Sequence, residues 1–532
     1  MRTLAFLLLL CATMLAHAAQ DSLITRGPYL QLGTDTSMII RWRTATAVAC
    51  TIKYGTSLNA QSQTLAELSA TTEHELRIGG LQPFTKYFYT IYNGANTITV
   101  AADDYSFVTN PTKGTVQPIH LWITGDMGDS SQTQRDVRDR YWNYVRNGRH
   151  TDAWLWLGDN VYSSGTDVEY QNRLFDVYPE VLRSIVSRPT PGNHDYGSID
   201  VNHNGPYYSN FTMPTTGEAG GVPSGKEGYY SYDYGSVHFV SLNSEPLQWF
   251  LTSTSEMCNW LKQDLAANQQ PWTIVYWHQP AYTKGGHDSD DLFSRSYFMR
   301  TNIVPILEQY GVDVVLSGHS HSYERTYMLH GHHGSSGSFD EPMKVYSKSG
   351  KLNDGGAYVK YTNGPNANKG IVYVVCGNGG RVENDAPLNH PAMYFSQQGR
   401  AGFMTIDVND MQLDAKYYDS EGTVWDEFTI VKSTENPNGI KSINDELGEL
   451  NIYPNPFSDI ITIELSLVSA QHLKVDLVDI NGKVVSVLAN GTLAAGVNTL
   501  SANTADLAKG NYVIRITSPL LGETSRLVTL QR

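Results

Sequence analysis

Apolar residues recur along the chain in short runs of strand length, and their spacing divides the sequence into three differently patterned regions. Residues 23–110 alternate apolar and polar positions over segments such as Thr85–Tyr92, and Gly79–Pro83 supplies a turn between two of them. Period two indicates strands with one buried face, and short strands separated by turns are typical of a β-sandwich. A first β-domain is therefore predicted over residues 23–112, as a spacer or wall beside the next region.

Residues 115–432 instead alternate apolar runs with segments of helical spacing. Runs of buried-strand length occupy residues 121–124, 153–157, 272–277 and 312–316. Helices are predicted over residues 130–147, with Ser130 or Ser131 as the N-terminal cap, and over residues 293–310. Strand–helix–strand order implies a sheet covered by helices, and such folds bind ligands beyond the carboxyl ends of their strands.

The last region is again strand-like and follows a polar stretch, residues 433–447, which is predicted to be a linker. Within residues 448–532, Asn481-Gly482 marks a hairpin, and residues 510–516 are predicted to be the final alternating strand. The expected architecture is multidomain, with an N-terminal β-sandwich, a central α/β domain and a small C-terminal β-sandwich.

The N-terminus has the pattern of a targeting segment. Arg2 carries positive charge, Leu4–Leu15 is an apolar run, and Ala16-His17-Ala18 has the small-x-small form of a cleavage site. A signal peptide is therefore predicted over residues 1–19, with an uncleaved anchor as the alternative. No other stretch is apolar enough to cross a membrane, so the mature chain is predicted to lack a transmembrane segment.

Composition narrows the classes of partner and the redox chemistry. A formal net charge of −15 argues against binding to a nucleic-acid scaffold but leaves room for a small phosphorylated substrate, because a bound metal can dominate the local charge. Of the four cysteines, Cys11 lies in the signal, so an odd number remains. A Cys258–Cys376 bridge is possible, whereas buried free cysteines are the alternative and, for Cys50, the favoured one.

Five short motifs in the central region carry the chemistry, and each lies near the end of an apolar run. They are Gly125–Gly128, Gly158–Tyr162, Gly192–Asp195, Val275–His278 and Gly318–His321. Taken singly, each has an ordinary explanation, such as a turn, a polar strand end or a buried histidine. Five in succession at strand ends are not explained by turns and predict a metal site.

The donor types in these motifs suit two metal ions. Asp126 and Asp159 offer carboxylate oxygens and Asn193 an amide oxygen, and Asp159 is the candidate bridge because a carboxylate has two oxygens. The imidazoles are His278, His319 and His321. In extended chain the last two would share a side, whereas a loop could direct them at different metals. Two ions a few ångströms apart are a standard device for displacing an oxygen from phosphorus.

The motifs resemble those of calcineurin-like metallophosphoesterases, and more closely those of purple acid phosphatases. The closer match rests on Tyr162, three residues after Asp159, and on Gly318–Arg325. The resemblance covers roughly residues 23–430 and implies an αββα catalytic domain of sheets flanked by helices. Leu81–Tyr87 also resembles a corner of fibronectin type III domains, so the N-terminal sandwich is expected to be of that type.

The resemblance also implies a ligand set for a dinuclear centre. The first metal would be iron(III), the second iron, zinc or manganese, and Asp159 would bridge them. The first metal would take Asp126, Tyr162 and His321, and the second Asn193, His278 and His319. A phenol with a pKa near 10 does not ionise unaided at neutral pH, but a trivalent ion can hold it as the phenolate that gives the purple colour. The alternative is a core tyrosine that packs beneath the site.

By the same resemblance, a metal-bound hydroxide would attack phosphorus in line. His194 is the candidate catalytic residue, to bind phosphate or protonate the leaving alkoxide, or else a residue that holds its loop. His287 resembles a substrate-binding histidine, with a solvated loop residue as the alternative. Asp195 stands where plant members usually have Glu, which casts little doubt on the ligands.

Three markers near the C-terminus resemble the sorting domain of the type IX secretion system. They are Tyr453–Pro456, Asp479–Lys483 and Gly510–Tyr512. With the N-terminal signal, they imply bacterial export through the periplasm, the export machinery as a partner, and a secreted or cell-surface protein. A carbohydrate-binding or adhesive sandwich is the alternative.

The expected function is a secreted, metal-dependent acid phosphatase acting on phosphate monoesters. One alternative keeps the metals but acts on phosphodiesters or nucleotides. Another is a non-catalytic surface binding protein, against which the complete ligand set argues.

Overall fold

The computed structural model describes residues 23–145, 150–196, 204–246, 251–354, 356–434, 447–519 and 522–531. The predicted signal peptide lies outside these residues. The chain forms two compact units: the first comprises residues 1–344, 371–406 and 416–426, and the second comprises residues 345–370, 407–415 and 427–532. Among the described residues, no helix has the length and apolar character needed to cross a membrane.

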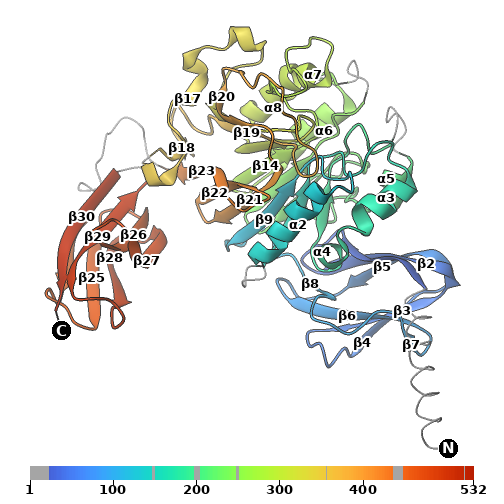
Figure 1. Cartoon of the computed structure of the whole chain (residues 1–532), viewed down its shortest axis with the longest axis horizontal. Helices are drawn as coiled ribbons and strands as arrows, with labels where there is room; N and C mark the ends of the chain where they lie inside the picture. Colours follow the sequence, from blue (N-terminus) through green and yellow to red (C-terminus); the bar gives the residue numbers. More distant parts are fainter. Residues whose placement is uncertain are drawn as a thin grey trace, which may run out of the picture. The chain divides into compact units, whose positions relative to one another are not determined.

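The first unit opens with a sandwich of two antiparallel sheets, drawn in blue in Figure 1. One sheet has the order β1 (Ile24–Gln31), β2 (Ser37–Val48), β5 (Thr71–Gly79). The other has the order β4 (Gln63–Ala66), β3 (Cys50–Gly55), β6 (Lys86–Asn93), β7 (Asn96–Thr97), and β8 (Ser106–Val108) also pairs with β6. Ile40, Trp42, Ile52 and Tyr89 are buried in its core. The prediction of an N-terminal sandwich is confirmed.

Hydrogen bonds connect the sandwich to the central region, residues 115–432, and the Arg26 and Arg188 side chains that donate them are buried. The Arg26 guanidinium donates to Asp167 Oδ1 at 2.9 Å and to Gln171 Oε1 at 2.8 Å. From the other side, Arg188 Nη2 donates to the Gly33 carbonyl at 2.8 Å. Hydrogen bonds to charged groups are stronger than those between neutral groups, so these contacts hold the sandwich against the central region.

The central region, residues 115–432, contains two large sheets. The first has the order β11 (Ser187–Pro189), β10 (Ala153–Trp156), β9 (Ile119–Thr124), β21 (Gly402–Asn409), β22 (Gln412–Asp419), β23 (Val424–Ser433). The second has the order β12 (Tyr230–Tyr234), β13 (Val237–Ser241), β14 (Trp272–Tyr276), β15 (Val314–Ser317), β19 (Ile371–Cys376), β16 (Tyr323–Leu329), with β20 (Met393–Gln397) on β16. Strands β9, β10 and β11 are parallel, as are β13, β14, β15 and β19.

Helices accompany both sheets. They are α2 (Gln132–Val145), α3 (Asp167–Tyr170), α4 (Pro179–Leu182), α5 (Pro206–Asn210), α6 (Glu256–Ala267), α7 (Arg295–Asn302) and α8 (Val304–Gln309). Helix α2 has the predicted cap, because Ser131 Oγ accepts from the Gln134 amide at 3.1 Å. The single helix predicted over residues 293–310 is wrong: it is divided at Ile303, since Pro305 lacks the N–H that a continuous helix needs.

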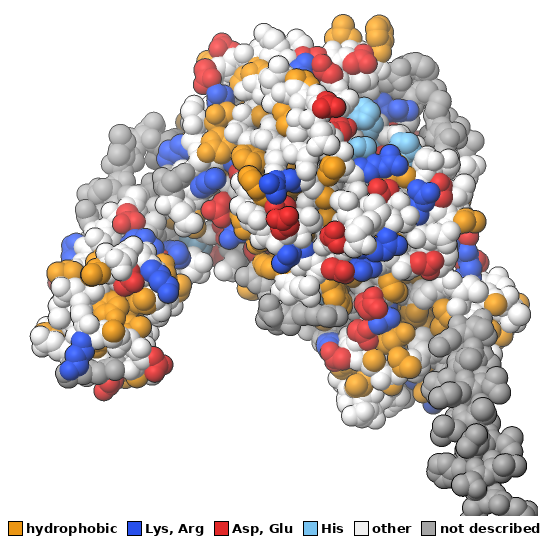
Figure 2. Space-filling view, viewed as in Figure 1, with side chains coloured by type: hydrophobic (Ala, Val, Ile, Leu, Met, Phe, Trp, Pro, Cys, Tyr) orange, Lys and Arg blue, Asp and Glu red, His pale blue; other side chains and the backbone are white. Residues whose placement is uncertain are grey.

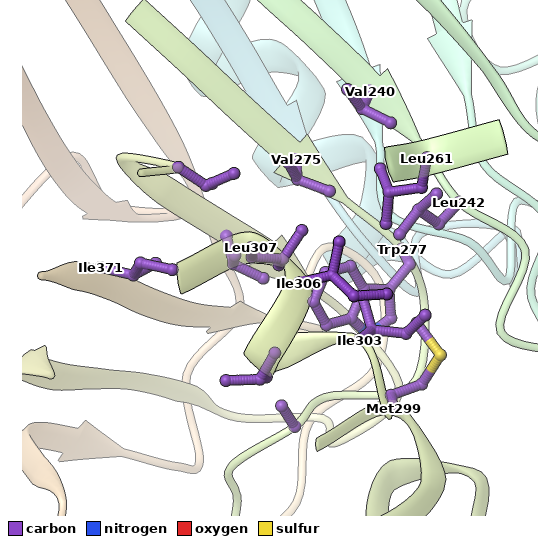
Figure 3. Close-up of a cluster of buried hydrophobic side chains, with 14 of the residues drawn as sticks. Val240, Leu242, Leu261, Val275, Trp277, Met299, Ile303, Ile306, Leu307 and Ile371 are labelled. Carbon is purple, nitrogen blue, oxygen red and sulfur yellow. The ribbon is translucent and has the colours of Figure 1, made fainter. Parts of the chain in front are cut away.

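One apolar core lies between the second sheet and helices α6, α7 and α8. Val275 and Trp277 extend from the β14 segment toward Leu261, Ile303 and Ile306, all of them buried (Figure 3). Burying side chains of this size contributes about 2 kcal/mol each. This core fixes strands β14 and β15, from whose ends three of the predicted metal ligands follow.

The second unit contains a C-terminal domain of two sheets. These have the orders β24 (Leu447–Tyr453), β25 (Ile460–Leu467), β28 (Gly496–Asn503) and β27 (Val484–Leu493), β26 (Gln471–Asp479), β29 (Gly510–Ser518), β30 (Gly522–Leu530). The predicted hairpin is present, with Gly482 at φ +83° in its turn. The prediction that residues 510–516 form the last strand is wrong. Strand β30 follows them, and its largely exposed polar residues give little alternating signal.

The segments that flank the predicted linker belong to strands. Ser433 ends β23 and Leu447 begins β24, and residues 435–446 lie outside the described part of the chain. Also in the second unit, β18 (Tyr358–Tyr361) pairs in parallel with the last residues of β23. β17 (Lys344–Tyr346) is short, like the 3-10 turns Ser336–Ser338, Glu341–Met343 and Leu352–Asp354.

The described cysteines are free thiols. Cys50, Cys258 and Cys376 are buried and unbridged, so the possible Cys258–Cys376 disulfide is not formed. Burial raises the pKa of each thiol, that of Cys50 to about 11, which keeps them protonated and unreactive.

Candidate metal centre

The five motifs come together at one edge of the two sheets. Asp126 follows β9, Asp159 follows β10, and the Gly192–Asp195 segment follows β11. On the other sheet, His278 follows β14, and His319 with His321 follows β15. Because β9, β10 and β11 are parallel, and so are β14 and β15, the residues that follow them gather at the same ends.

One half of the cluster is centred on His278, which is fully buried. Its Nε2 lies 3.1 Å from Asn193 Oδ1, 3.2 Å from His319 Nδ1 and 3.4 Å from Asp159 Oδ1. Its Nδ1 donates to the Leu157 carbonyl at 2.8 Å. That bond fixes the ring and its tautomer and leaves Nε2 as the ligand atom. Several acceptors that converge on one point stay together only if a proton or a cation lies among them.

The other half is centred on Tyr162, whose side chain is fully buried. Its hydroxyl lies 3.0 Å from Asp126 Oδ1 and 3.2 Å from His321 Nε2, and these last two atoms are 3.5 Å apart. An oxygen, a phenol and an imidazole nitrogen within this span are a donor set that fits a trivalent or divalent ion. The Tyr162 hydroxyl thus lies among the predicted ligands, and its role as a metal ligand stays a prediction.

The electrostatics of the cluster call for positive charge. Burial raises the pKa of Tyr162 well above its usual value, and the charges of Asp126 and Asp159 raise it further. Burial alone would lower the pKa of His278, but Asp159 and Asp126 raise it well above the usual range. Burial and the neighbouring His278 lower the pKa of His319. Without a metal, one proton on His278 partly offsets the buried carboxylates, and a metal would replace it.

Backbone turns place the ligands. Asp126, Asp159 and His319 have φ values of +55°, +49° and +69°, so the chain turns sharply as it leaves each strand. The neighbouring glycines are required by close approach. A Cβ at Gly192 would lie 2.2 Å from the Asp159 nitrogen, and one at Gly318 would lie 2.4 Å from Asp126 Oδ2.

Three family models match the sequence in the order of its domains. The model described as "Purple acid Phosphatase, N-terminal domain" matches residues 26–109, and "Calcineurin-like phosphoesterase" matches residues 119–323. "Secretion system C-terminal sorting domain" matches residues 451–529. The chain therefore contains a calcineurin-like phosphoesterase region, and its N-terminal sandwich is similar to the N-terminal domain of purple acid phosphatases. The N-terminal match is to that family's own domain, so the expected fibronectin type III identity stays a prediction.

Known relatives are similar to part of this chain. Purple acid phosphatase 21 of Arabidopsis thaliana is 31% identical over 264 residues, which are 47% of this chain and 53% of that protein. Acid phosphatase type 7 of Danio rerio is 24% identical over 446 residues, covering 76% of this chain and 90% of that protein. The chain thus spans about half the length of the first relative and most of the second.

A solved structure agrees with the fold of the phosphoesterase. The purple acid phosphatase PPD1 from yellow lupin (Lupinus luteus) seeds superimposes with a TM-score of 0.61 at 18% identity, over 76% of this chain and 74% of that one. At this identity the likeness concerns the fold. It includes the central region whose strand ends hold the clustered donors.

Two side chains of the Gly192–Asp195 loop have different roles. Asn193 lies at the centre, whereas buried Asp195 accepts from the Gly192 amide at 2.7 Å, the Asn160 side chain at 2.9 Å and the Tyr170 hydroxyl at 2.9 Å. Burial, with the nearby Asp159 charge, raises the pKa of Asp195 to about 7. Asp195 therefore joins the loops that carry Asp159 and Asn193.

Both predicted catalytic-side histidines lie beside the ligands. The His194 ring is 4.7 Å from the Tyr162 ring, and its Nδ1 donates to the Ser163 carbonyl at 2.7 Å. The His287 ring stacks on His319 with centroids 3.8 Å apart. His287 belongs to an exposed segment, so it meets both solvent and the centre.

Sequence reasoning missed a sixth segment of the site, Gly377–Glu383, which follows β19. Its backbone packs on the ligand loops: a Cβ at Gly377 would lie 2.2 Å from the Ser320 carbonyl, and one at Gly380 would lie 2.4 Å from the Met127 carbonyl. Glu383 Oε1 is 3.6 Å from His321 Nδ1, and its Oε2 accepts from the Gly286 amide at 2.6 Å. An apolar run that ends in Gly-x-Gly-Gly is the signal that would have found it.

Proposed function

We propose that the protein is an exported acid phosphatase that hydrolyses phosphate monoesters at a dinuclear metal centre. The observation that carries this proposal is the convergence of seven donor side chains, from five strand ends, on two adjacent points. Oxygen and nitrogen atoms of these side chains face one another there at 3.0–3.5 Å, and the Tyr162 hydroxyl donates to Asp126 Oδ1. Such a set fits cations and suits phosphoryl chemistry.

The ligand assignment follows the two halves of the cluster. Asp126, Tyr162 and His321 would hold the first metal, proposed to be iron(III). Asn193, His278 and His319 would hold the second, which would be iron, zinc or manganese, with Asp159 between the two. When bound, the metals lower the pKa of water and offset the charge on a phosphoryl group.

The chain's own residues would orient the substrate and move the proton. His194 donates from Nδ1 to the Ser163 carbonyl, so Nε2 would bind a phosphoester oxygen or give a proton to the leaving group when the ring is doubly protonated. His287, stacked on His319, is placed to bind the ester from the exposed side. The Leu157 carbonyl keeps the His278 proton on Nδ1.

The C-terminal match supports the proposed location. A sorting domain indicates secretion or a cell-surface location in bacteria. Passage through the periplasm by means of the predicted N-terminal signal, which lies outside the described residues, completes the proposal.

The test combines metal analysis, the visible spectrum and hydrolysis of p-nitrophenyl phosphate by the purified full chain. The expected result is two metals per chain, a tyrosinate-to-iron(III) band that Tyr162→Phe removes, and greater activity at acidic pH. A protein that binds no metal and hydrolyses neither the monoester nor bis-p-nitrophenyl phosphate would overturn the proposal. A clear preference for the diester would replace the monoesterase by a phosphodiesterase.

A further inference from the structure

Arg381, in the missed segment after β19, has a position that the metal ligands do not explain. Its guanidinium carbon lies 3.7 Å from the centroid of the Tyr162 ring, the same ring that His194 contacts. Histidine, lysine or arginine, and carboxylate side chains lie together on the face of the first unit seen in Figure 2. The guanidinium therefore lies beside the ring of a proposed metal ligand.

Other stacked arginines in the described residues use their N–H groups on the protein. Arg26, Arg183 and Arg400 each lie over an aromatic ring, and each is also paired with an aspartate. Within the described part of the chain, Arg381 has no such hydrogen bond or ion pair. The carboxylate two residues further on, Glu383, is engaged by the Gly286 amide instead.

The backbone on both sides of Arg381 is anchored by hydrogen bonds. Gly379 donates to the Gly125 carbonyl at 2.9 Å, and Glu383 donates from its amide to the His321 carbonyl at 3.0 Å. The segment that contains Arg381 is thus attached at both ends to loops that carry proposed ligands. Such anchoring is what a fixed binding group needs, because the cost of ordering it is met on folding.

Neighbouring basic side chains are already neutralised. Lys284, in the His287 segment, bonds to Asp288 and Asp290 at 2.8 Å. Arg295 donates to the Pro246 carbonyl at 3.0 Å and faces Glu245. Arg381 therefore supplies the guanidinium available to an anion at the centre, and guanidinium groups bind phosphoryl oxygens in pairs.

We propose that Arg381 binds the phosphoryl group of the substrate and selects doubly charged phosphomonoesters over singly charged phosphodiesters. This inference rests on the proposed phosphatase function and adds a specificity-determining residue to it. A monoester offers three terminal oxygens and, above a pH of about 6, a second negative charge. A diester lacks both, so it gains less from the guanidinium.

The experiment compares Arg381→Met and Arg381→Lys with the wild type at a pH above about 6. For p-nitrophenyl phosphate, Arg381→Met is expected to lower kcat/KM by about 10- to 100-fold and to raise the inhibition constant of inorganic phosphate similarly, as the loss of a charged hydrogen bond implies. For bis-p-nitrophenyl phosphate the loss should be several-fold smaller. Arg381→Lys should restore part of the monoester rate.

Arg400→Met is the matched control, since Arg400 also stacks on an aromatic ring but is paired with Asp419. It should leave the ratio of the two rates unchanged. A structural role for Arg381 would instead lower both rates equally and shift the visible band or the metal content, and this result would overturn the inference. If the wild type hydrolyses neither ester, it is the proposed function that fails.

Discussion

Two buried clusters in this molecule contain residues of metal-binding type, yet their contacts differ. In the N-terminal sandwich, Cys50, Glu67 and His74 bring a thiol, a carboxylate and an imidazole within 4.8 Å of one another, as Asp159, His278 and His319 do at the candidate metal centre. In the sandwich, Glu67 accepts from the Cys50 amide at 2.6 Å and from His74 Nδ1 at 2.8 Å.

The remaining histidine nitrogen of the sandwich cluster is also engaged, because His74 Nε2 lies 2.8 Å from Thr44 Oγ1. Trp42 stacks on the ring at 4.6 Å. In the sandwich cluster the Glu67 carboxylate accepts from both of its neighbours, whereas at the centre the Asn193 and Asp159 oxygens both face the single nitrogen His278 Nε2. Residue type alone therefore does not define a metal site; the difference is whether the protein itself satisfies the polar atoms.

The largest expected effect separates the two clusters by metal content. Asp159→Ala should lose metal and lower the rate of p-nitrophenyl phosphate hydrolysis by about a thousandfold or more, because metals contribute several kcal/mol to such reactions. Metal analysis and steady-state kinetics of the purified variant are the measurements. Full activity with both ions retained would contradict the assignment of Asp159.

His238 is another buried histidine whose ring nitrogens both face protein carboxylates. Its contribution to stability can be tested by changing the pH. His238 lies 2.8 Å from both Asp233 and Asp264, and although burial opposes its charge, these carboxylates raise its pKa to about 9. A raised pKa in the folded state stabilises the protein fully below about 6.5, and this contribution is lost as the pH rises through about 9. It amounts to about 3 kcal/mol.

Denaturant unfolding of the wild type and His238→Gln at pH 6 and pH 10 measures this contribution. The free-energy difference between the two proteins should shrink by about that amount, roughly 3 kcal/mol, at the higher pH. An unchanged difference would show that His238 is neutral in the folded protein.

Glu67→Gln tests the sandwich cluster directly. The free energy of unfolding should fall by about 2 kcal/mol, since a hydrogen bond to a charged group is weakened. Metal content and activity should stay at wild-type values, because Glu67 already satisfies its neighbours without an ion. If Glu67→Gln lost a bound metal, the sandwich cluster would itself be a metal site, and the proposed difference between the two clusters would be wrong.

Glu383→Gln should have the smallest effect. The carboxylate faces His321 Nδ1 and thereby orients the ring whose Nε2 is a proposed ligand, so activity and metal retention should fall about tenfold. Metal loss during titration with a chelator is the direct measurement. Glu341→Gln is a matched control, since Glu341 is exposed and paired with Lys344, and it should retain metal like the wild type.

Much of the architecture is predictable because apolar periodicity is local. The strands at Ala153–Trp156 and Trp272–Tyr276 and the Ser131 cap follow from residues near in sequence. The break at Ile303 was predictable from Pro305 but needs the proline to be weighed against a strong apolar pattern. Strand β30 was missed because only its last residues, such as Val528 and Leu530, are buried, and the exposed polar residues before them show no alternating apolar pattern.

The site likewise contains residues that the sequence predicts and residues that it does not. Ligand-type residues at strand ends are visible in sequence, so the seven proposed ligands could be named and are found together. The contributions of Asp195, Arg381 and Glu383 could not be predicted, because they depend on which loops meet in space. The residue types of these three side chains are ordinary, and only the side chains that surround them in the folded protein suggest their roles.

The left-handed turns at Asp126, Asp159 and His319 have a consequence for evolution. Each costs about 1 kcal/mol for a residue with a side chain, whereas glycine adopts it freely. Selection for greater stability of the metal-free protein would favour glycine at these three positions, and glycine has no side chain to bind a metal. The ligands persist in conformations that the rest of the fold must compensate, so improvements in thermostability and in metal affinity are expected to oppose each other here.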